Sequence, residues 1–172
     1  MPTAMLDKIP ARTAANAEGP ASVGLDQSGV QHLLGYRLAL AEAATRRVYQ
    51  SHVGKPFELR PVEFTMLLLL AANQKVTPKQ LALTLGLPPS NLTVLIDRLA
   101  QRELLQRERN PSDGRATILR LTPAGSDLAH RARRVSLTME DGLLTVLSAA
   151  ERAMLAELLA KLSRASGASM PR

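Results

Sequence analysis

The chain has 172 residues, and 45% of them are hydrophobic, which excludes a wholly disordered protein and suffices for one packed domain with terminal extensions. Cysteine is absent, which excludes disulfides, cysteine-based zinc sites and thiol redox switches. The formal net charge of +7 favours an anionic partner such as nucleic acid, although many basic proteins bind none.

Aromatic content and apolar runs bear on secondary structure and location. Only 2% of the residues are aromatic, which favours helices over an all-β fold because strands are enriched in aromatic residues. The apolar run at residues 64–72 is far shorter than the roughly 20 residues that span a bilayer. The N-terminus also lacks the apolar core of a secretory signal. We therefore expect a mainly helical, cytoplasmic protein.

The N-terminal part divides into an irregular and a periodic stretch. Residues 1–25 are rich in alanine, proline, glycine and small polar residues, which predicts a disordered arm. From about 27 to 51, apolar residues recur every three or four positions, as in an amphipathic helix. A break follows, and Pro61 then fits a first helical position with Glu63 in the first turn, so an apolar helix is predicted to about residue 73.

Two short helices are predicted next. Thr77 and Gln80 match a capping box that opens the first of them, and Gly86 fits a left-handed helix end. The second covers residues 90–102 and has one apolar face. Two short helices joined by a break of this length are typical of a helix-turn-helix. An ordinary αα-hairpin in a bundle fits the same segment equally well.

A β-hairpin follows directly and favours the helix-turn-helix. The runs LLQRERN (104–110) and ATILRLT (116–122) flank a Pro-Ser-Asp-Gly turn, and the second run alternates as a half-exposed strand does. Nine arginines and four acidic residues lie between positions 98 and 134, so positive charge gathers around the hairpin. A helix-turn-helix followed by a basic hairpin is a winged helix, which favours DNA binding.

Two helices complete the chain. Thr122 and Pro123 repeat the cap pattern and predict a long helix whose apolar face runs from Leu128 to Leu143. Ser148 and Glu151 form another capping box, which opens a final leucine-rich helix ending near residue 165.

Residues 83–125 resemble the winged helix-turn-helix of the MarR family of bacterial transcriptional regulators. Three motifs carry the resemblance, and the order of the other helices extends it over about residues 27–165. Two positions depart from the family pattern. Pro88 stands where a serine or threonine cap is usual, which shifts the helix start by about one residue, and Glu103 stands where a glycine commonly ends the recognition helix. The motifs are Asp97-Arg98-Leu99, Asp113-x-Arg115 and Leu121-Thr122-x-x-Gly125.

The resemblance implies a mainly α fold with a small β-hairpin, built as a winged helix-turn-helix plus a helical dimerisation layer. Family members are homodimers, and the leucine-rich terminal helices have more apolar surface than one small winged domain can cover. Packing of these helices on each other within a monomer is the alternative. The expected segments are a disordered arm (1–25), a dimerisation helix and linker (26–60), the DNA-binding domain (61–122), the long and second dimerisation helices (123–165) and a tail (166–172).

The resemblance also implies roles at DNA. The helix at 90–102 enters the major groove, where Val94 offers only apolar contact, for example with a thymine methyl group. Arg115 is implied to insert into the minor groove, and Asp113 to orient the wing by pairing with an arginine. The other residues expected at bases or phosphates are Pro89, Ser90, Asn91, Thr93, Arg98, Arg107 and Arg109.

Many members of the family release DNA when a small anion, often aromatic, binds between the dimer layer and the winged domain. Arg60 stands at the expected N-cap of the helix that begins at Pro61 and has no acceptor with which to cap it, so it suits a carboxylate or phosphate. Core packing of the two phenylalanines and simple solvation of Arg60 are the alternatives. The expected ligand-binding residues are His32, Tyr36, Arg37, Phe57, Arg60 and Phe64.

The sequence therefore predicts a homodimeric DNA-binding regulator, a repressor released from a pseudo-palindromic operator by an aromatic acid, an acyl-CoA or a similar anion. An architectural DNA-binding protein without an effector is the alternative. We expect no cofactor, and no metal because the three histidines lack carboxylates at ligand spacing. An enzyme is disfavoured because the chain has no phosphate loop, paired catalytic carboxylates or nucleophile with a base.

Overall fold

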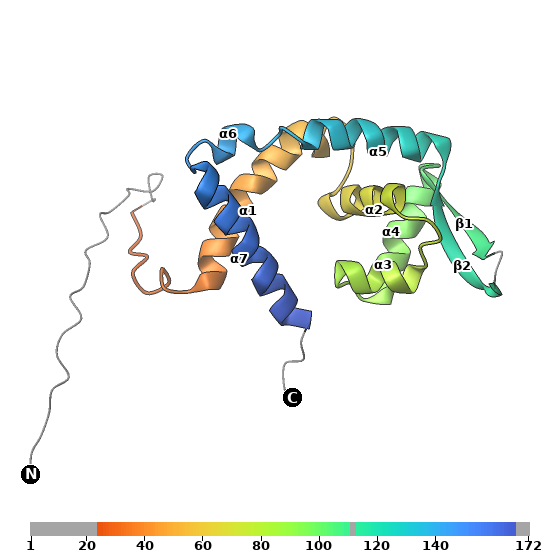
Figure 1. Ribbon diagram of the computed structural model, residues 1–172, viewed down its shortest axis with the longest axis horizontal. Helices are drawn as coiled ribbons and strands as arrows, with labels where there is room; N and C mark the ends of the chain where they lie inside the picture. Colours follow the sequence, from red (N-terminus) through yellow and green to blue (C-terminus); the bar gives the residue numbers. More distant parts are fainter. Residues whose placement is uncertain (1–23, 111–112, 168–172) are drawn as a thin grey trace, which may run out of the picture. The chain divides into compact units, whose positions relative to one another are not determined.

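A computed structural model describes residues 24–110 and 113–167 (Figure 1), and it leaves undescribed the side chains of residues 110, 113–116 and 165–167. The predicted arm and tail therefore lie mostly outside the described residues. The chain divides into a short N-terminal unit ending at Leu38 and a larger unit from Ala39 onward. Within the described ranges, no helix is both long and apolar enough to cross a membrane.

The structure confirms a mainly helical fold with one antiparallel hairpin. The elements, in chain order, are α1 (Leu34–Tyr49), the π-helical turn η1 (Gln50–Gly54), α2 (Pro61–Ala72), α3 (Pro78–Leu85), α4 (Pro89–Gln101), β1 (Leu105–Asn110), β2 (Asp113–Leu121), α5 (Pro123–Ser136), α6 (Asp141–Leu144) and α7 (Ala149–Gly167).

Two helices are shorter than their apolar patterns predict. The first begins at Leu34 instead of about 27, because Asp26 bonds the backbone N–H and hydroxyl of Ser28 and stabilises a turn in place of a helix. The long helix ends at Ser136 and is followed by turns, in which the Thr138 N–H donates to the Val135 carbonyl oxygen and the Asp141 N–H donates to the Thr138 carbonyl oxygen. The predicted apolar face therefore does not continue to Leu143 within one helix.

Side-chain capping marks the starts of α3 and α7, as the sequence predicts. Thr77 Oγ1 accepts from the Gln80 N–H at 3.2 Å while Gln80 Oε1 accepts from the Thr77 N–H at 2.9 Å. Gly86 closes α3 in the left-handed region with φ 63°. At α7, hydrogen bonds from the backbone N–H and hydroxyl of Ser148 lower the pKa of the Glu151 carboxyl.

One core holds the winged unit together. Three buried residues of α4, Leu92, Ile96 and Leu99, form its inner face. The Leu119 N–H donates to the Val76 carbonyl oxygen at 2.8 Å, which adds an isolated bridge to the outer side of β2. This packing fixes α4 and the hairpin on one body and turns the opposite face of α4 outward. The same core cluster also contains Met66, Leu67, Leu81, Leu105, Leu119 and Ala132.

Candidate nucleic-acid interface

The outward face of α4 carries the predicted DNA-reading residues. Ser90, Asn91, Thr93 and Val94 are all exposed, whereas Leu92 between them is 2% exposed. The helix begins at Pro89 with Pro88 as its N-cap, so it starts one residue earlier than predicted and has no side-chain cap. Proline fits both positions, because the N–H group that it lacks has no partner inside the helix at this end.

Helix α4 ends without the glycine that is common at this position in the family. Glu103 itself takes the left-handed conformation, with φ 56°. The Glu103 N–H donates to the Ala100 carbonyl oxygen at 2.9 Å, and the Leu104 N–H donates to the Leu99 carbonyl oxygen at 3.0 Å. These two bonds form a Schellman motif, which normally places glycine at the left-handed position. The helix therefore ends where the family pattern places its end, with a strained residue in the glycine position.

An ion pair joins the recognition helix to the wing. Asp97 Oδ1 on α4 lies 2.6 Å from Arg107 on β1, and both side chains are half-exposed. Arg107, predicted to contact phosphate, thus has a partner within the protein, whereas the side chain of Arg109 is exposed. The pair links α4 to the hairpin, and because exposed pairs contribute only about 0 to 1 kcal/mol, its main effect is on the position of the hairpin relative to α4.

The tip of the wing differs from the predicted turn. β2 already begins at Asp113, so residues 111–112 connect the strands and the Asp-Gly pair lies in β2. The register passes from Arg109 opposite Thr117 to Asn110 opposite Asp113, which leaves residues 114–116 as a bulge. Arg115 lies in this bulge. The described residues exclude the side chains of Asp113 and Arg115, so the pairing of the first and the insertion of the second stay predictions.

A close backbone approach joins the base of the wing to α5. Thr122 Oγ1 donates to the Glu103 carbonyl oxygen at 2.6 Å and accepts from the Gly125 N–H at 3.0 Å. A Cβ atom at Gly125 would overlap the backbone carbonyl of Leu104. This contact explains the glycine of the Leu-Thr-x-x-Gly motif, because only a residue without a side chain lets α5 begin against the end of the helix-turn-helix.

Behind α4 lies a buried carboxylate with a cationic partner. Glu63 is fully buried, and its Oε2 accepts from the Arg60 N–H at 2.8 Å. Its Oε1 lies 3.1 Å from Arg98 Nε, an ion pair without hydrogen-bond geometry. The Tyr49 hydroxyl donates to the Leu59 carbonyl oxygen at 3.1 Å. Burial and the negative charge of Glu63 raise the pKa of Tyr49 to about 12. Arg98, predicted to clamp phosphate, is thus also tied to the core.

Three arginines and one acidic residue, Glu58, are among the residues that line a hollow of about 590 Å³ behind the recognition helix. Arg60 comes from the start of α2, and its side chain makes no cap hydrogen bond, as the sequence predicts. Arg98 belongs to α4 and Arg102 is its C-cap, and Arg102 donates to the carbonyl oxygens of Glu58 and Phe57 at 2.8 and 3.3 Å. Sequence reasoning missed Arg102 for this hollow, although its spacing four residues after Arg98 places both on one helix face.

The other predicted ligand residues belong to both units of the chain. Within the N-terminal unit, His32 is exposed, the Tyr36 hydroxyl donates to Gln27 Oε1 at 2.8 Å, and Arg37 Nε donates to the Gln31 carbonyl oxygen at 2.7 Å. In the larger unit, Arg131 lies over the half-buried Phe57 ring at 5.9 Å. Phe64 is 9% exposed and its ring centroid lies 5.8 Å from that of Tyr49, which matches the core-packing alternative.

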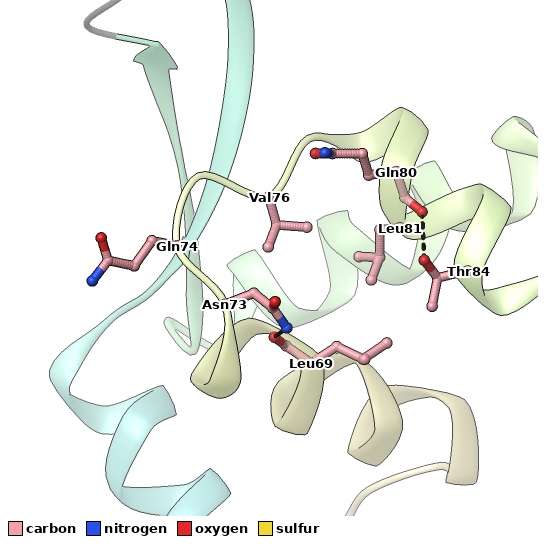
Figure 2. A pocket seen from close by; sticks show the side chains of 7 residues that line it. All are labelled: Leu69, Asn73, Gln74, Val76, Gln80, Leu81 and Thr84. Atoms are coloured by element: carbon pink, nitrogen blue, oxygen red, sulfur yellow. Dashed lines mark hydrogen bonds between the residues drawn. The ribbon is translucent and has the colours of Figure 1, made fainter.

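A different hollow, of about 420 Å³, lies between the end of α2 and α3 (Figure 2). Three of its four polar side chains, Asn73, Gln80 and Thr84, are hydrogen-bonded to neighbouring residues. Asn73 Nδ2 donates to the Leu69 carbonyl oxygen and Thr84 Oγ1 donates to the Gln80 carbonyl oxygen, both at 2.9 Å. Gln80 also serves the α3 capping box. This hollow is therefore a product of local capping, and it offers no charged group comparable to the three arginines.

Known proteins share this architecture. The MarR family sequence profile matches residues 57–116. The transcriptional regulator MhqR of Bacillus subtilis is 31% identical over 119 residues, which are 66% of this chain and 82% of that protein. The chain belongs to the MarR family. It is a DNA-binding transcriptional regulator with a winged helix-turn-helix, and its relatives are regulators, which supports a role other than catalysis.

Solved MarR-family structures are similar over most of the chain. The transcriptional repressor CouR, bound to a 23-mer DNA duplex, matches with a TM-score of 0.71 and 35% identity, covering 81% of this chain and 98% of that one. The regulator PcaV from Streptomyces coelicolor, in complex with its natural ligand, matches with a TM-score of 0.69 and 26% identity, covering 84% and 99%. Relatives of this MarR-family chain thus include one solved on DNA and one solved with a ligand.

Proposed function

We propose that the chain is a homodimeric repressor that binds a pseudo-palindromic operator and leaves it when a small anion binds. The observation that carries the DNA contact is the exposed outer face of α4, which lies beside a wing anchored to it by the Asp97–Arg107 pair. Helices of this kind place their N-terminal residues against base edges in the major groove. The match to CouR, a repressor solved on DNA, supports this assignment.

Exposed leucines support the dimer. In α7, Leu155, Leu158, Leu159 and Leu162 follow helical spacing and are each 42–49% exposed. Burying a leucine side chain stabilises an assembly by about 1.5 to 3 kcal/mol, so a stripe of four favours a second copy over water. In α1, Leu34, Leu38 and Leu40 are likewise 41–55% exposed. We infer that these helices form the dimerisation layer, as the family resemblance implies.

The arginine-lined hollow supports the anionic ligand. A carboxylate or phosphate placed there would meet Arg60 beside a helix N-terminus and would compete with Glu63 for Arg98. Arg98 belongs to α4, so such a ligand acts directly on the DNA-reading helix. A ligand shifts the equilibrium between DNA-bound and released protein only by the difference in its affinity for the two. An anion that draws Arg98 away from a DNA phosphate or from Glu63 would have such a difference in affinity. The similarity to PcaV, which was solved in complex with its natural ligand, supports the proposal that this chain also responds to a ligand.

The test begins with the DNA upstream of the chain's own gene. Fluorescence anisotropy measures binding of a labelled duplex, and aromatic acids and their coenzyme A thioesters are then added in turn. We expect saturable binding to a short pseudo-palindrome by a dimer in analytical ultracentrifugation, with release by at least one compound. Binding without sequence preference would support the architectural alternative, and sequence-specific binding that no anion releases would remove the ligand from the proposal.

Two variants separate the contacts. Arg115→Ala is expected to weaken operator binding while the melting temperature and dimer stay unchanged. Arg60→Ala is expected to keep operator binding and to lose the response to the releasing compound. The exposed Arg47→Ala on α1 serves as the matched control for the loss of one positive charge. Unchanged DNA affinity in Arg115→Ala would mean that the wing tip does not touch DNA.

A further inference from the structure

The outward face of α4 has an apolar residue at its centre. Ser90, Val94, Asp97 and Gln101 follow one another at spacings of four, three and four residues, so they form one row along the helix. Val94 is 65% exposed. Asp97, its neighbour in the row, is engaged by Arg107 at 2.6 Å. A β-branched apolar side chain thus lies in water at the middle of the face that meets DNA.

Few side chains near Val94 can form hydrogen bonds with base edges. Residues 80–96 contain no charged residue, so the first two turns of α4 cannot form the bidentate pair of arginine or lysine with guanine. Thr93 Oγ1 already donates to the Pro89 carbonyl oxygen at 3.0 Å, so at a base this side chain offers only an acceptor oxygen and its methyl group. Ser90 and Asn91 remain as hydrogen-bonding readers. The centre of the reading surface is therefore apolar.

Among the four base-pair orientations, the thymine C5 methyl group is the apolar feature of the major groove. We propose that Val94 reads a thymine methyl group, so that the chain distinguishes thymine from uracil at one position of each half-site. This inference rests on the entry of α4 into the major groove, which belongs to the proposed function. It goes further by assigning sequence discrimination to burial of a single methyl group against Val94.

The expected ratio of dissociation constants for the uracil and thymine duplexes follows from the apolar area that the methyl group removes from water. Removal of one buried methyl-sized group weakens binding roughly fourfold, which corresponds to about 0.8 kcal/mol. A dimer that reads two symmetrical half-sites squares this ratio when both thymines are replaced, to roughly 16-fold. The hydrogen-bonding atoms of thymine and uracil are the same, so Ser90 and Asn91 contribute equally to both complexes.

The experiment uses the full chain and a duplex that it selects from a random library. Each thymine of that duplex is replaced in turn by deoxyuridine, and the ratio of the two dissociation constants is measured for three proteins. The native chain is expected to show a ratio of roughly four at one position of each half-site. Val94→Ala is expected to bring that ratio close to one. Val146→Ala, the same substitution at a residue that is 83% exposed outside the helix-turn-helix, is expected to keep the native ratio.

The outcomes separate this inference from the proposed function. Ratios near one at every thymine of a selected duplex, or an unchanged ratio in Val94→Ala, would overturn the methyl readout and leave specific DNA binding intact. A chain that selects no sequence from the library would overturn both. Because each ratio compares two duplexes with one protein, a change in dimerisation or folding affects both dissociation constants and leaves the ratio unaltered.

Discussion

Removal of the Arg98 side chain tests whether the recognition helix is held by the buried carboxylate behind it. In the native chain, Arg98 Nε lies 3.1 Å from Oε1 of the fully buried Glu63. In Arg98→Ala that oxygen loses its cationic partner. Oε2 keeps the hydrogen bond from the Arg60 N–H, so the buried carboxyl group retains half of its contacts. We therefore expect Arg98→Ala to destabilise the fold itself as well as to affect DNA binding.

The expected loss of unfolding free energy depends on how deeply Glu63 and Arg98 are each buried. Removing one partner of a buried pair costs about 3 to 5 kcal/mol, because the other charge is left in a medium of low dielectric constant. The Arg98 side chain is 36% exposed, so water screens part of this interaction and reaches the site after truncation. We expect a loss of about 2 to 3 kcal/mol in the free energy of unfolding. For a chain of this size that lowers the melting temperature by roughly 4–12 °C.

Urea denaturation followed by circular dichroism measures the effect, at one protomer concentration because dimerisation contributes to the apparent stability. Glu63→Gln in the Arg98→Ala background removes the buried charge and keeps an acceptor for the Arg60 N–H. The double variant should therefore be at least about 1 kcal/mol more stable than Arg98→Ala alone. A single variant within about 0.5 kcal/mol of the native chain, or strictly additive losses, would refute the reasoning. DNA affinity of the double variant then reports the phosphate contact separately.

Three further predictions concern the backbone and pH. Gly125→Ala should destabilise the fold by about 1 to 3 kcal/mol in urea, because its Cβ would overlap the Leu104 carbonyl, and native-like stability would contradict that close approach. Glu103→Gly should stabilise the fold by about 0.5 to 1 kcal/mol, because it relieves the left-handed strain at φ 56° at some cost in chain entropy, and a loss of stability would argue against the Schellman end. Tyr49→Phe should lose about 1 kcal/mol at pH 8 with its hydrogen bond to Leu59. Because burial and Glu63 raise the Tyr49 pKa from 10.0 to about 12, stability from its neutral form is full below pH 10 and falls as pH rises towards 12. The deficit of the variant should therefore shrink above pH 10, and a constant deficit would contradict the shifted pKa.

Local signals in the sequence were reliable where a few neighbouring residues satisfy each other. The capping pair of Thr77 and Gln80 and the left-handed Gly86 were predicted and are observed, because each depends on atoms within four residues. The start of the first helix was wrong for a related reason. Asp26 bonds Ser28 and stabilises a competing turn, although the apolar periodicity continues through this stretch.

The candidate site shows where local reasoning ends. Spacing on α4 predicted which residues face outward, because helical geometry fixes this from one buried stripe. The partners of Arg98 and Arg107 were not predicted, since Glu63 and Asp97 lie 35 and 10 positions away in the sequence and no local pattern joins them. The family resemblance implied only that both arginines face DNA.

The sequence by itself determined the order of the helices, the hairpin and the residues on the exposed face of α4, since these follow from periodicity, caps and turn residues in short stretches. Only the tertiary structure showed which charged side chains are paired within the protein and which elements touch. Packing buries Glu63 behind α4 and ties Arg98 to it, brings Arg60 and Arg102 to the same hollow, and presses Gly125 against Leu104. Such contacts depend on distances between elements far apart in the chain, which the core sets and a one-dimensional pattern does not contain.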